Sequence, residues 1–175
     1  KYMNTILMDY LDDFCTAYLD DILIFSEDPL QHTEHVHKVL ERLRAAGLQC
    51  DIKKSEFDVT ETKYLGFIIS TEGIRVDPDK IAVVKYWKQP RTVKQVQSFI
   101  GFCNFYRRFI DNFGRMARPL IRLTRKGHVF DFDEDCMEAF DKLKEALTSA
   151  PVLALYDPLL LTRMETDASD GVVAG

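Results

Sequence analysis

The sequence predicts an α+β fold in which short antiparallel strands come first and a group of helices follows. Two short β-prone runs, at residues 15–18 and 22–26, flank an acidic turn, which is the pattern of a β-hairpin. Beyond residue 78, apolar residues recur at helical spacing in segments bounded by proline or by capping residues. A strand-rich first part followed by a helix-rich second part indicates the α+β class.

The first part of the chain contains two predicted helices, one on either side of the hairpin. Residues 3–11 carry apolar side chains at helical spacing. Residues 29–46 do the same, and Gly47 is a suitable C-terminal stop. Residues 48–70 then contain strand-like pieces, including the apolar run at residues 64–69.

The second part contains four predicted helices and a final strand. The first helix covers residues 79–88 and ends before Pro90. Thr92 and Gln95 have the spacing of a capping box for the next helix, and Asp133 can cap the last one. The remaining predicted elements are helices over residues 93–112, 115–125 and 134–148 and a strand over residues 159–166.

Charge is distributed unevenly along the 175 residues, whose formal net charge is −5. Residues 79–127 carry 12 basic and 2 acidic residues, whereas residues 1–40 carry 2 and 8, and residues 128–175 carry 3 and 11. The basic block therefore predicts a nucleic-acid-binding surface that the average conceals. Hydrophobic residues make up 46% and charged residues 29%, as in globular proteins, and no apolar run reaches the roughly 18 residues of a membrane span.

The basic block also contains aromatic residues at helical spacing, and we expect this stripe to be core packing, not a stacking platform for bases. The arginines and lysines are the better candidates for phosphate contacts. The aromatic stripe consists of Phe99, Phe102, Tyr106, Phe109 and Phe113.

The cysteines and histidines form no recognisable metal site. The four cysteines are far apart and include no CxxC pair, so we expect reduced thiols in an intracellular protein. Three histidines within one predicted helix lack a cysteine or carboxylate at a ligand spacing, so we expect a surface cluster. These residues are Cys15, Cys50, Cys103, Cys136, His32, His35 and His37.

Asp20 and Asp21, at the tip of the predicted hairpin, are the main candidates for catalysis. Adjacent carboxylates repel each other, and a bound divalent cation removes that cost. Mg²⁺ prefers carboxylate and phosphate oxygens, and two such ions can stabilise the attacking and leaving oxygens of phosphoryl transfer. The alternative is a solvated acidic turn, which is the commoner role of paired aspartates in turns.

The tetrapeptide Tyr-Leu-Asp-Asp occurs twice, at residues 10–13 and 18–21. Only the second copy is followed by an apolar run of the kind that a buried strand requires, at residues 22–26. We therefore take the second copy as the candidate site and expect the first to lie on the surface at the end of a helix.

Residues 18–26 (YLDDILIFS) resemble the YxDD motif of reverse transcriptases, in the form found in gypsy-type LTR retrotransposons. Residues 48–57 (LQCDIKKSEF) resemble the next motif of the palm, and residues 64–67 (YLGF) resemble the primer-grip turn. The other matches are residues 97–101 and 104–110 to the thumb signature, residues 150–153 to the entry of the connection, and residues 165–169 to the first acidic strand of RNase H.

The resemblance implies an RNA-directed DNA polymerase with an associated RNase H, which extends a primer on an RNA or DNA template by nucleotidyl transfer with two Mg²⁺ ions. It makes Asp20 and Asp21 the catalytic metal ligands and Asp167 the first metal ligand of RNase H. It places Lys54 near the pyrophosphate of the incoming nucleotide, with Lys53 as the open alternative. The implied primer–template contacts are Tyr18, Gly66, Phe67, Lys80, Lys85, Lys88, Arg91, Lys94, Arg107 and Arg108.

The same resemblance divides the chain into a palm part (1–78), a basic helical thumb (79–127), a connection (128–158) and the start of an RNase H-like domain (159–175). A further palm aspartate, the fingers and most of RNase H fall outside these residues, so we expect the chain to be inactive alone. The alternative is a decayed or domesticated, non-catalytic nucleic-acid-binding module.

The implied partners are primer–template nucleic acid, deoxynucleoside triphosphates and the rest of a polyprotein, with no membrane. The implied location is intracellular, either in a cytoplasmic virus-like particle or in the nucleus.

Overall fold

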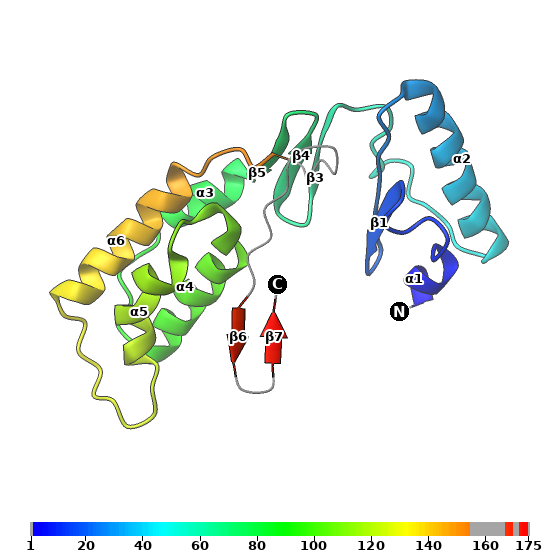
Figure 1. The fold of residues 1–175 in the computed structure, drawn as a ribbon. Coiled ribbons are helices and arrows are strands. Elements are labelled where there is room, and N and C mark those ends of the chain that lie inside the picture. Colours follow the sequence, from blue (N-terminus) through cyan, green and yellow to red (C-terminus); the bar gives the residue numbers. More distant parts are fainter. Residues whose placement is uncertain (1, 155–166, 170–171, 175) are drawn as a thin grey trace.

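The computed structural model describes residues 2–154, 167–169 and 172–174 of the chain. Within them, helices are combined with small antiparallel sheets, so the predicted α+β class is confirmed. Figure 1 shows a hairpin with its helices, then a small sheet, then a bundle of helices, then a short second hairpin.

The N-terminal unit, residues 2–48, is a two-stranded hairpin packed against helices (Figure 1). Its longer helix begins after Asp28, whose carboxylate accepts a hydrogen bond from the backbone N–H of Leu30 at 3.0 Å. The buried core of this unit is small, and it consists of Leu7, Phe14, Cys15, Val39 and Leu43. The elements are α1 (Tyr2–Ile6), β1 (Cys15–Tyr18), β2 (Asp21–Ile24) and α2 (Pro29–Ala45).

A three-stranded antiparallel sheet follows, in the order β3 (Glu61–Tyr64), β4 (Phe67–Ser70) and β5 (Gly73–Val76). Tyr64 pairs with Phe67, so Leu65 and Gly66 form a two-residue turn between the first two strands. The outer edge of β5 is bridged by Leu153, which pairs antiparallel with Ile74.

The helical unit, residues 78–148, packs around the larger core of the molecule. Large side chains in this core include the fully buried Phe99, Leu120 and Leu143. The elements are α3 (Pro78–Lys85), α4 (Val93–Phe105), the 3₁₀-helix η1 (Arg107–Phe109), α5 (Phe113–Leu123) and α6 (Glu134–Thr148), and a separate hairpin is formed by β6 (Asp167–Ser169) and β7 (Val172–Ala174).

Two of the predicted capping residues act as caps in the structure. The Thr92 hydroxyl accepts from the N–H of Gln95 at 3.2 Å, and Asp133 accepts from the N–H of Cys136 at 3.0 Å. The side chain of Gln95 accepts from the N–H of Arg91 instead of Thr92, so the reciprocal half of the predicted capping box is displaced by one residue.

Three predicted elements are wrong in extent. The helix expected over residues 3–11 ends at Ile6, and irregular turns follow up to β1, one of them with Asp12 at φ +64°. The helix expected over residues 93–112 ends at Phe105 and continues as a single 3₁₀ turn. The apolar run at residues 64–69 is two strands joined by a turn, since Gly66 holds φ +82°, where a glycine has no steric cost.

Residues 48–60 contain no strand, although strand-like pieces were expected there. The strand expected over residues 159–166 lies outside the described residues.

Candidate functional site

The second Tyr-Leu-Asp-Asp tetrapeptide forms the tip of the β1–β2 hairpin. Tyr18 pairs with Asp21, so Leu19 and Asp20 make a two-residue loop. Leu19 has φ +56°, a left-handed conformation that costs a residue with a Cβ about 1–2 kcal/mol. Asp20 and Asp21 are both exposed, and 58% of the Tyr18 side chain and 71% of the Leu19 side chain are exposed. The strained loop therefore presents two adjacent carboxylates to solvent.

The base of the hairpin is anchored while its tip projects. Cys15 is fully buried, and Ile22 and Ile24 pack against the N-terminal core. The N–H of Phe25 donates to the carbonyl of Phe14 at 3.0 Å, which extends the strand pairing by one step. A buried base makes the register of the pair specific, because a slip of one residue would turn the apolar side chains outward.

Asp20 and Asp21 form no ion pair with the residues that the structure describes. Two neighbouring carboxylates without a cationic partner suit a divalent cation that prefers carboxylate oxygens. The described residues contain no group of three or more histidine, cysteine, aspartate or glutamate side chains that would hold a metal. The hairpin thus fits Mg²⁺ as a source of ligands but does not complete a coordination shell.

The first copy of the tetrapeptide has a different setting, although it too is on the surface. Asp12 and Asp13 lie in a turn between α1 and β1, and the N–H of Asp12 donates to the carbonyl of Cys15 at 3.0 Å. Tyr10 is held by Arg42, whose guanidinium donates to the Tyr10 hydroxyl at 3.1 Å and to Asp9 at 2.9 Å. The first copy therefore contacts the start of β1 and does not form a hairpin tip.

Tyr64, at the end of β3, connects the small sheet to the hairpin. Its hydroxyl is buried and makes no hydrogen bond of normal geometry to the described residues. Burial raises the pKa of Tyr64, the nearby Thr16 side chain on β1 opposes this shift, and the charge of Asp21 adds to it. Tyr64 of the small sheet therefore lies near Thr16 and Asp21 of the hairpin.

The Gly66 turn (Leu65–Gly66) is fixed to the helical unit. The carbonyl of Gly66 accepts hydrogen bonds from the Tyr106 hydroxyl at 3.2 Å and from the N–H of Asp77 at 3.3 Å. A Cβ at Gly66 would lie 2.9 Å from the Tyr106 hydroxyl oxygen, so this approach requires glycine. The ring of Phe67 stacks on that of Phe105 with centroids 5.2 Å apart. The Gly66 carbonyl thus joins the turn to the start of α3, at Asp77, and to the end of α4, at Tyr106.

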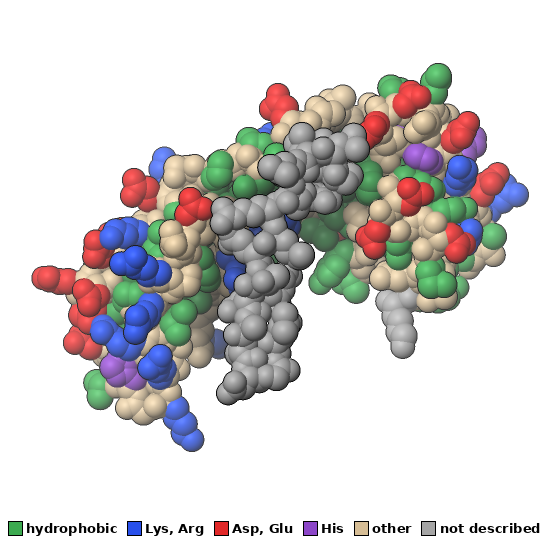
Figure 2. Space-filling model, in the orientation of Figure 1, with side chains coloured by type: hydrophobic (Ala, Val, Ile, Leu, Met, Phe, Trp, Pro, Cys, Tyr) green, Lys and Arg blue, Asp and Glu red, His purple; other side chains and the backbone are tan. Residues whose placement is uncertain are grey.

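The predicted phosphate contacts in residues 79–127 are exposed side chains of the helical unit. Figure 2 shows Lys and Arg side chains gathered over the helical unit, whereas Asp and Glu side chains prevail over the N-terminal unit. Arg122 belongs to the same basic block but pairs with Asp133, the cap of α6. Seven predicted contacts are exposed and have no ion pair among the described residues, namely Lys80, Lys85, Lys88, Arg91, Lys94, Arg107 and Arg108.

The aromatic stripe is core, as expected from its spacing. Phe99, Tyr106 and Phe109 are buried, and Phe102 and Phe113 pack against them. Sequence reasoning missed Phe105 as a site residue, although it is 54% exposed beside the Gly66 turn. The sequence signal is its position directly before Tyr106 of the buried stripe, because neighbouring residues of a helix point to different faces.

No ion pair or hydrogen bond in the described part of the chain joins the remaining predicted residues to the hairpin tip. Lys54 is exposed in the irregular stretch after α2, and its ammonium lies 3.8 Å from the carboxylate of Asp51. Lys53 is also exposed there. Asp167 begins β6 opposite Ala174, and its side chain lies outside what the structure describes.

Two of the three histidines of α2 are more buried than expected. The Nδ1 atoms of His32 and His35 lie 3.1 Å and 2.7 Å from the Ser26 hydroxyl oxygen, and both side chains are half-buried. His35 also stacks on Phe14 with ring centroids 3.9 Å apart. Only His37 is exposed, so the expectation of a surface cluster is wrong for two of the three histidines.

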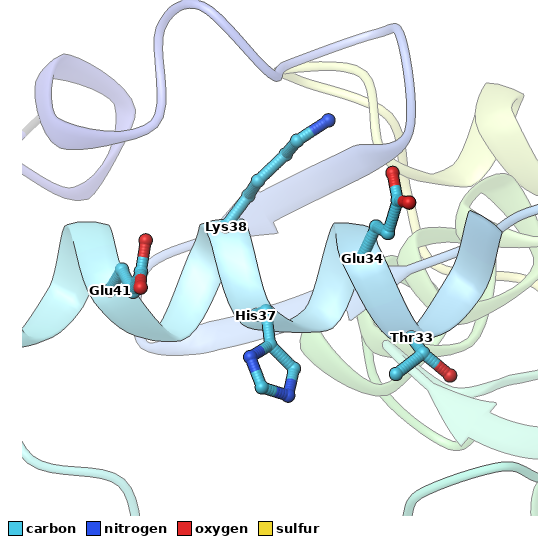
Figure 3. Close-up of a pocket in the computed structure, with 5 residues that line it drawn as sticks. All are labelled: Thr33, Glu34, His37, Lys38 and Glu41. Carbon is cyan, nitrogen blue, oxygen red and sulfur yellow. The ribbon is translucent and has the colours of Figure 1, made fainter. Parts of the chain in front are cut away.

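A shallow hollow on α2 does not belong to the candidate site. Figure 3 shows its lining side chains spread around one helix instead of converging on a point. The residues are Thr33, Glu34, His37, Lys38 and Glu41.

Two family models match the chain, and they bear on the hairpin and on the C-terminal part. Residues 1–69 match the reverse transcriptase (RNA-dependent DNA polymerase) family, and residues 132–175 match the RNase H-like domain found in reverse transcriptase. Residues 1–69 thus belong to the reverse transcriptase family, and residues 132–175 to the RNase H-like domain found in reverse transcriptase.

Curated relatives support this membership over almost the whole chain. The chain is 32% identical to the retrovirus-related Pol polyprotein from transposon opus of Drosophila melanogaster, with 99% of the chain and 18% of the relative covered. It is 34% identical to the transposon Tf2-3 polyprotein of Schizosaccharomyces pombe, with 98% of the chain and 13% of the relative covered. The chain thus spans less than a fifth of these relatives.

Solved reverse transcriptase structures have the same fold. The foamy viral protease-reverse transcriptase in complex with double-stranded DNA matches 89% of this chain and 28% of its own, with a TM-score of 0.77 and 28% identity. Its complex with an RNA/DNA hybrid matches 87% of this chain and 21% of its own, with a TM-score of 0.74 and 28% identity. No helix in the described part of the chain is long and apolar enough to cross a bilayer.

Proposed function

We propose that this chain supplies part of the active site and of the primer-holding surface of an RNA-directed DNA polymerase with an associated RNase H. The observation that carries the proposal is the hairpin tip, where Asp20 and Asp21 are exposed, adjacent and without a cationic partner in the described part of the chain. Matching of residues 1–69 to the reverse transcriptase family supports the same assignment.

In this proposal, Asp20 and Asp21 hold Mg²⁺, and Asp20 is the direct ligand. The metal would neutralise negative charge on the phosphates during nucleotidyl transfer. The protein's own contribution is placement, because the buried base of the hairpin fixes the direction of the two carboxylates. A metal site with only two ligands in this chain requires further ligands from outside the described residues.

We assign the primer strand to the surface between the hairpin tip and the Gly66 turn. Tyr18 is exposed on the hairpin, and the Gly66 turn is held by Tyr106 and Asp77. Phe67 acts here by anchoring the turn within the aromatic cluster. The exposed ring of Phe105, beside this turn, is added to the predicted contacts.

The seven exposed basic residues hold the phosphates of the primer–template duplex. The foamy viral relatives were solved with double-stranded DNA and with an RNA/DNA hybrid, which supports a duplex as the ligand of this surface. Such contacts are sequence-independent and weaken steeply with salt. The deoxynucleoside triphosphate binds at the metal site, with Lys54 or Lys53 near its pyrophosphate.

The proposal assigns residues 1–78 to the palm, 79–127 to the thumb and 128–158 to the connection. Residues 159–175 begin the RNase H-like domain, with Asp167 as its first metal ligand. The structure of the N-terminal, sheet and helical parts supports these boundaries at residue 78, where the strands end and Pro78 starts α3.

The test is Mg²⁺-dependent primer extension by the reverse transcriptase that contains this segment. Asp20→Asn is expected to reduce the extension rate at least about 100-fold, because metal-ion stabilisation of phosphoryl transfer is worth several kcal/mol. The matched control is Asp12→Asn, the same position in the first tetrapeptide, which should extend primers within about twofold of wild type. Equal rates for Asp20→Asn and wild type would reject the assignment.

A further inference from the structure

The loop between α3 and α4, residues 86–92, carries two of the predicted phosphate contacts, Lys88 and Arg91. Both side chains are exposed, and neither forms an ion pair with the residues that the structure describes. No aspartate or glutamate occurs between Asp79 and Asp111, so this stretch has no acidic side chain of its own to repel a phosphate. Since no side chain pairs with the two cations, their placement depends on the backbone of the loop.

A side chain of α6 holds the peptide bond that precedes Lys88. The ammonium of Lys144 donates to the carbonyl of Trp87 at 3.2 Å. This carbonyl belongs to the planar peptide unit that also contains the N–H of Lys88, so its orientation fixes the direction in which the chain enters Lys88. Lys144 is half-buried, and its ammonium lies 5.1 Å from the centre of the Phe140 ring on the same helix. The contact is possible because α6 packs beside α3 (Figure 1).

Trp87 is also held by the two helices that flank the loop. Its N–H donates to the carbonyl of Val84, on α3, at 3.0 Å. Its ring centroid lies 5.5 Å from that of Phe99 and 5.2 Å from that of Phe102, both on α4. The residue before Lys88 is therefore fixed by three helices, and α6 contributes the hydrogen bond to its carbonyl.

The peptide bond that precedes Arg91 is held in a similar way by α4. The N–H of Arg91 donates to the Oε1 atom of Gln95 at 2.7 Å. Pro90, the residue before it, is fully buried, and its ring restricts φ to about −65°. Both cations of the loop thus follow a peptide unit that a helix side chain holds. A loop that is ordered before binding loses less conformational entropy when a ligand binds.

We infer that Lys144 is a positioning residue for the primer–template, which acts through the Trp87 carbonyl to hold Lys88 and Arg91 as a preformed pair of phosphate contacts. This role rests on the proposed function, since it requires a duplex on the helical unit. Lys144 itself touches no nucleic acid in this account. The pair recognises the sugar–phosphate backbone and not the bases, because phosphate contacts carry no sequence information.

The test is primer–template binding by the parent reverse transcriptase at several salt concentrations. Lys144→Met keeps a long side chain beside Phe140 but removes the donor to the Trp87 carbonyl. The negative slope of log affinity against log salt concentration should become shallower by up to about 1.8, which corresponds to two phosphate contacts at about 0.9 each. The matched control is Lys142→Met, which removes the same charge from the same helix. The Lys142 ammonium lies 2.6 Å from Glu138, so this control should keep the wild-type slope.

The salt slope separates a positioning role from a merely structural one. Molecules that fail to fold lower the active fraction but do not change the slope that the folded molecules give. Lys144→Arg keeps the charge and hydrogen-bond donors, and should therefore keep the wild-type slope. An unchanged slope in Lys144→Met, or an equally shallow slope in Lys144→Arg and Lys144→Met, would overturn the inference.

A second background separates positioning from direct contact with a phosphate. In an enzyme that carries Lys88→Ala and Arg91→Ala, Lys144→Met should change the slope no further, because the residues it positions are gone. A further loss of slope in this background would make Lys144 a phosphate contact and not a positioning residue. The unmodified enzyme tests the proposed function separately: a flat wild-type slope rejects the duplex surface, whereas a steep wild-type slope that Lys144→Met leaves unchanged rejects only the role of Lys144.

Discussion

At the scale of single residues, Leu19 carries the strain of the candidate site. Two-residue hairpin loops usually place Gly, Asn or Asp where φ is positive, yet this loop holds a leucine at φ +56°. The strain is tolerated because the base of the hairpin is buried and over-determines the loop. The charge and spacing of Asp20 and Asp21 predicted the site, but the leucine conformation depends on the pairing of Tyr18 with Asp21, which spacing alone does not fix.

Leu19→Gly should increase the free energy of unfolding by about 1 kcal/mol, since glycine adopts this conformation without the steric cost. Leu19→Ala is the matched control, because it shortens the side chain but keeps the Cβ. Urea denaturation of the two variants measures the difference. A glycine variant no more stable than the alanine variant would show that the loop is not strained.

Asp77 makes stability depend on pH. The N–H of Asp79 and then the ammonium of Lys63 hold the pKa of the Asp77 carboxyl below its usual value, with partial opposition from burial. A lowered folded-state pKa means that this stabilisation is complete above the unfolded-state pKa near 4 and is lost as the pH falls through the folded-state value.

Asp77→Asn keeps a capping oxygen but has no charge to titrate. Its free energy of unfolding should therefore fall less than that of wild type between pH 5 and about 2. Urea denaturation across this range measures both slopes. If the free energy of unfolding falls equally with pH in the wild type and in Asp77→Asn, Asp77 is not the group that titrates.

At the scale of elements, the joint between the small sheet and the helical unit depends on a contact between residues 40 apart in sequence. The Tyr106 hydroxyl reaches the carbonyl of Gly66, and Phe67 packs among Phe105, Tyr106 and Phe109. Helical periodicity predicted that the aromatic stripe is buried. It could not predict which turn the stripe would hold, or that the helix would end at Phe105, because both depend on contacts distant in sequence.

A double-mutant cycle measures this joint. Tyr106→Phe should cost about 1 kcal/mol through loss of one hydrogen bond. Gly66→Ala should cost more, because its Cβ would lie 2.9 Å from the Tyr106 hydroxyl oxygen at a backbone conformation of φ +82°. In the Tyr106→Phe background, Gly66→Ala should cost less, since the close contact is gone and the next atom, on Phe105, lies at 3.7 Å. If the effects of Tyr106→Phe and Gly66→Ala on the free energy of unfolding simply add, the contact between the two residues does not contribute to stability.

At the scale of the whole molecule, the net charge of −5 conceals an acidic unit with a candidate metal site and a basic unit with a candidate duplex surface. The charge blocks predicted this division. They could not show that Arg122 pairs with Asp133 while Lys94 has no ion pair within the described part of the chain, because both are basic residues of the same block. The antiparallel bridge between Ile74 and Leu153 joins two segments far apart in the chain, so no local sequence pattern predicts it.

Lys94→Ala should make the negative slope of log affinity against log salt concentration shallower by about 0.9, because one phosphate contact is lost. The matched control is Lys142→Ala, since the Lys142 ammonium is already 2.6 Å from Glu138 on the same helix. Primer–template binding by the parent enzyme at several salt concentrations measures both slopes. An unchanged slope for Lys94→Ala would remove that residue from the proposed surface.

The central claim is that the second Tyr-Leu-Asp-Asp copy, and not the first, is the catalytic one. The most direct measurement compares primer extension in Mg²⁺ by two double variants of the parent reverse transcriptase, Asp20→Asn with Asp21→Asn and Asp12→Asn with Asp13→Asn. The account predicts that the first double variant loses at least about 100-fold in rate while still binding primer–template, and that the second extends primers almost as wild type does. Undiminished extension by the Asp20 and Asp21 double variant would contradict it.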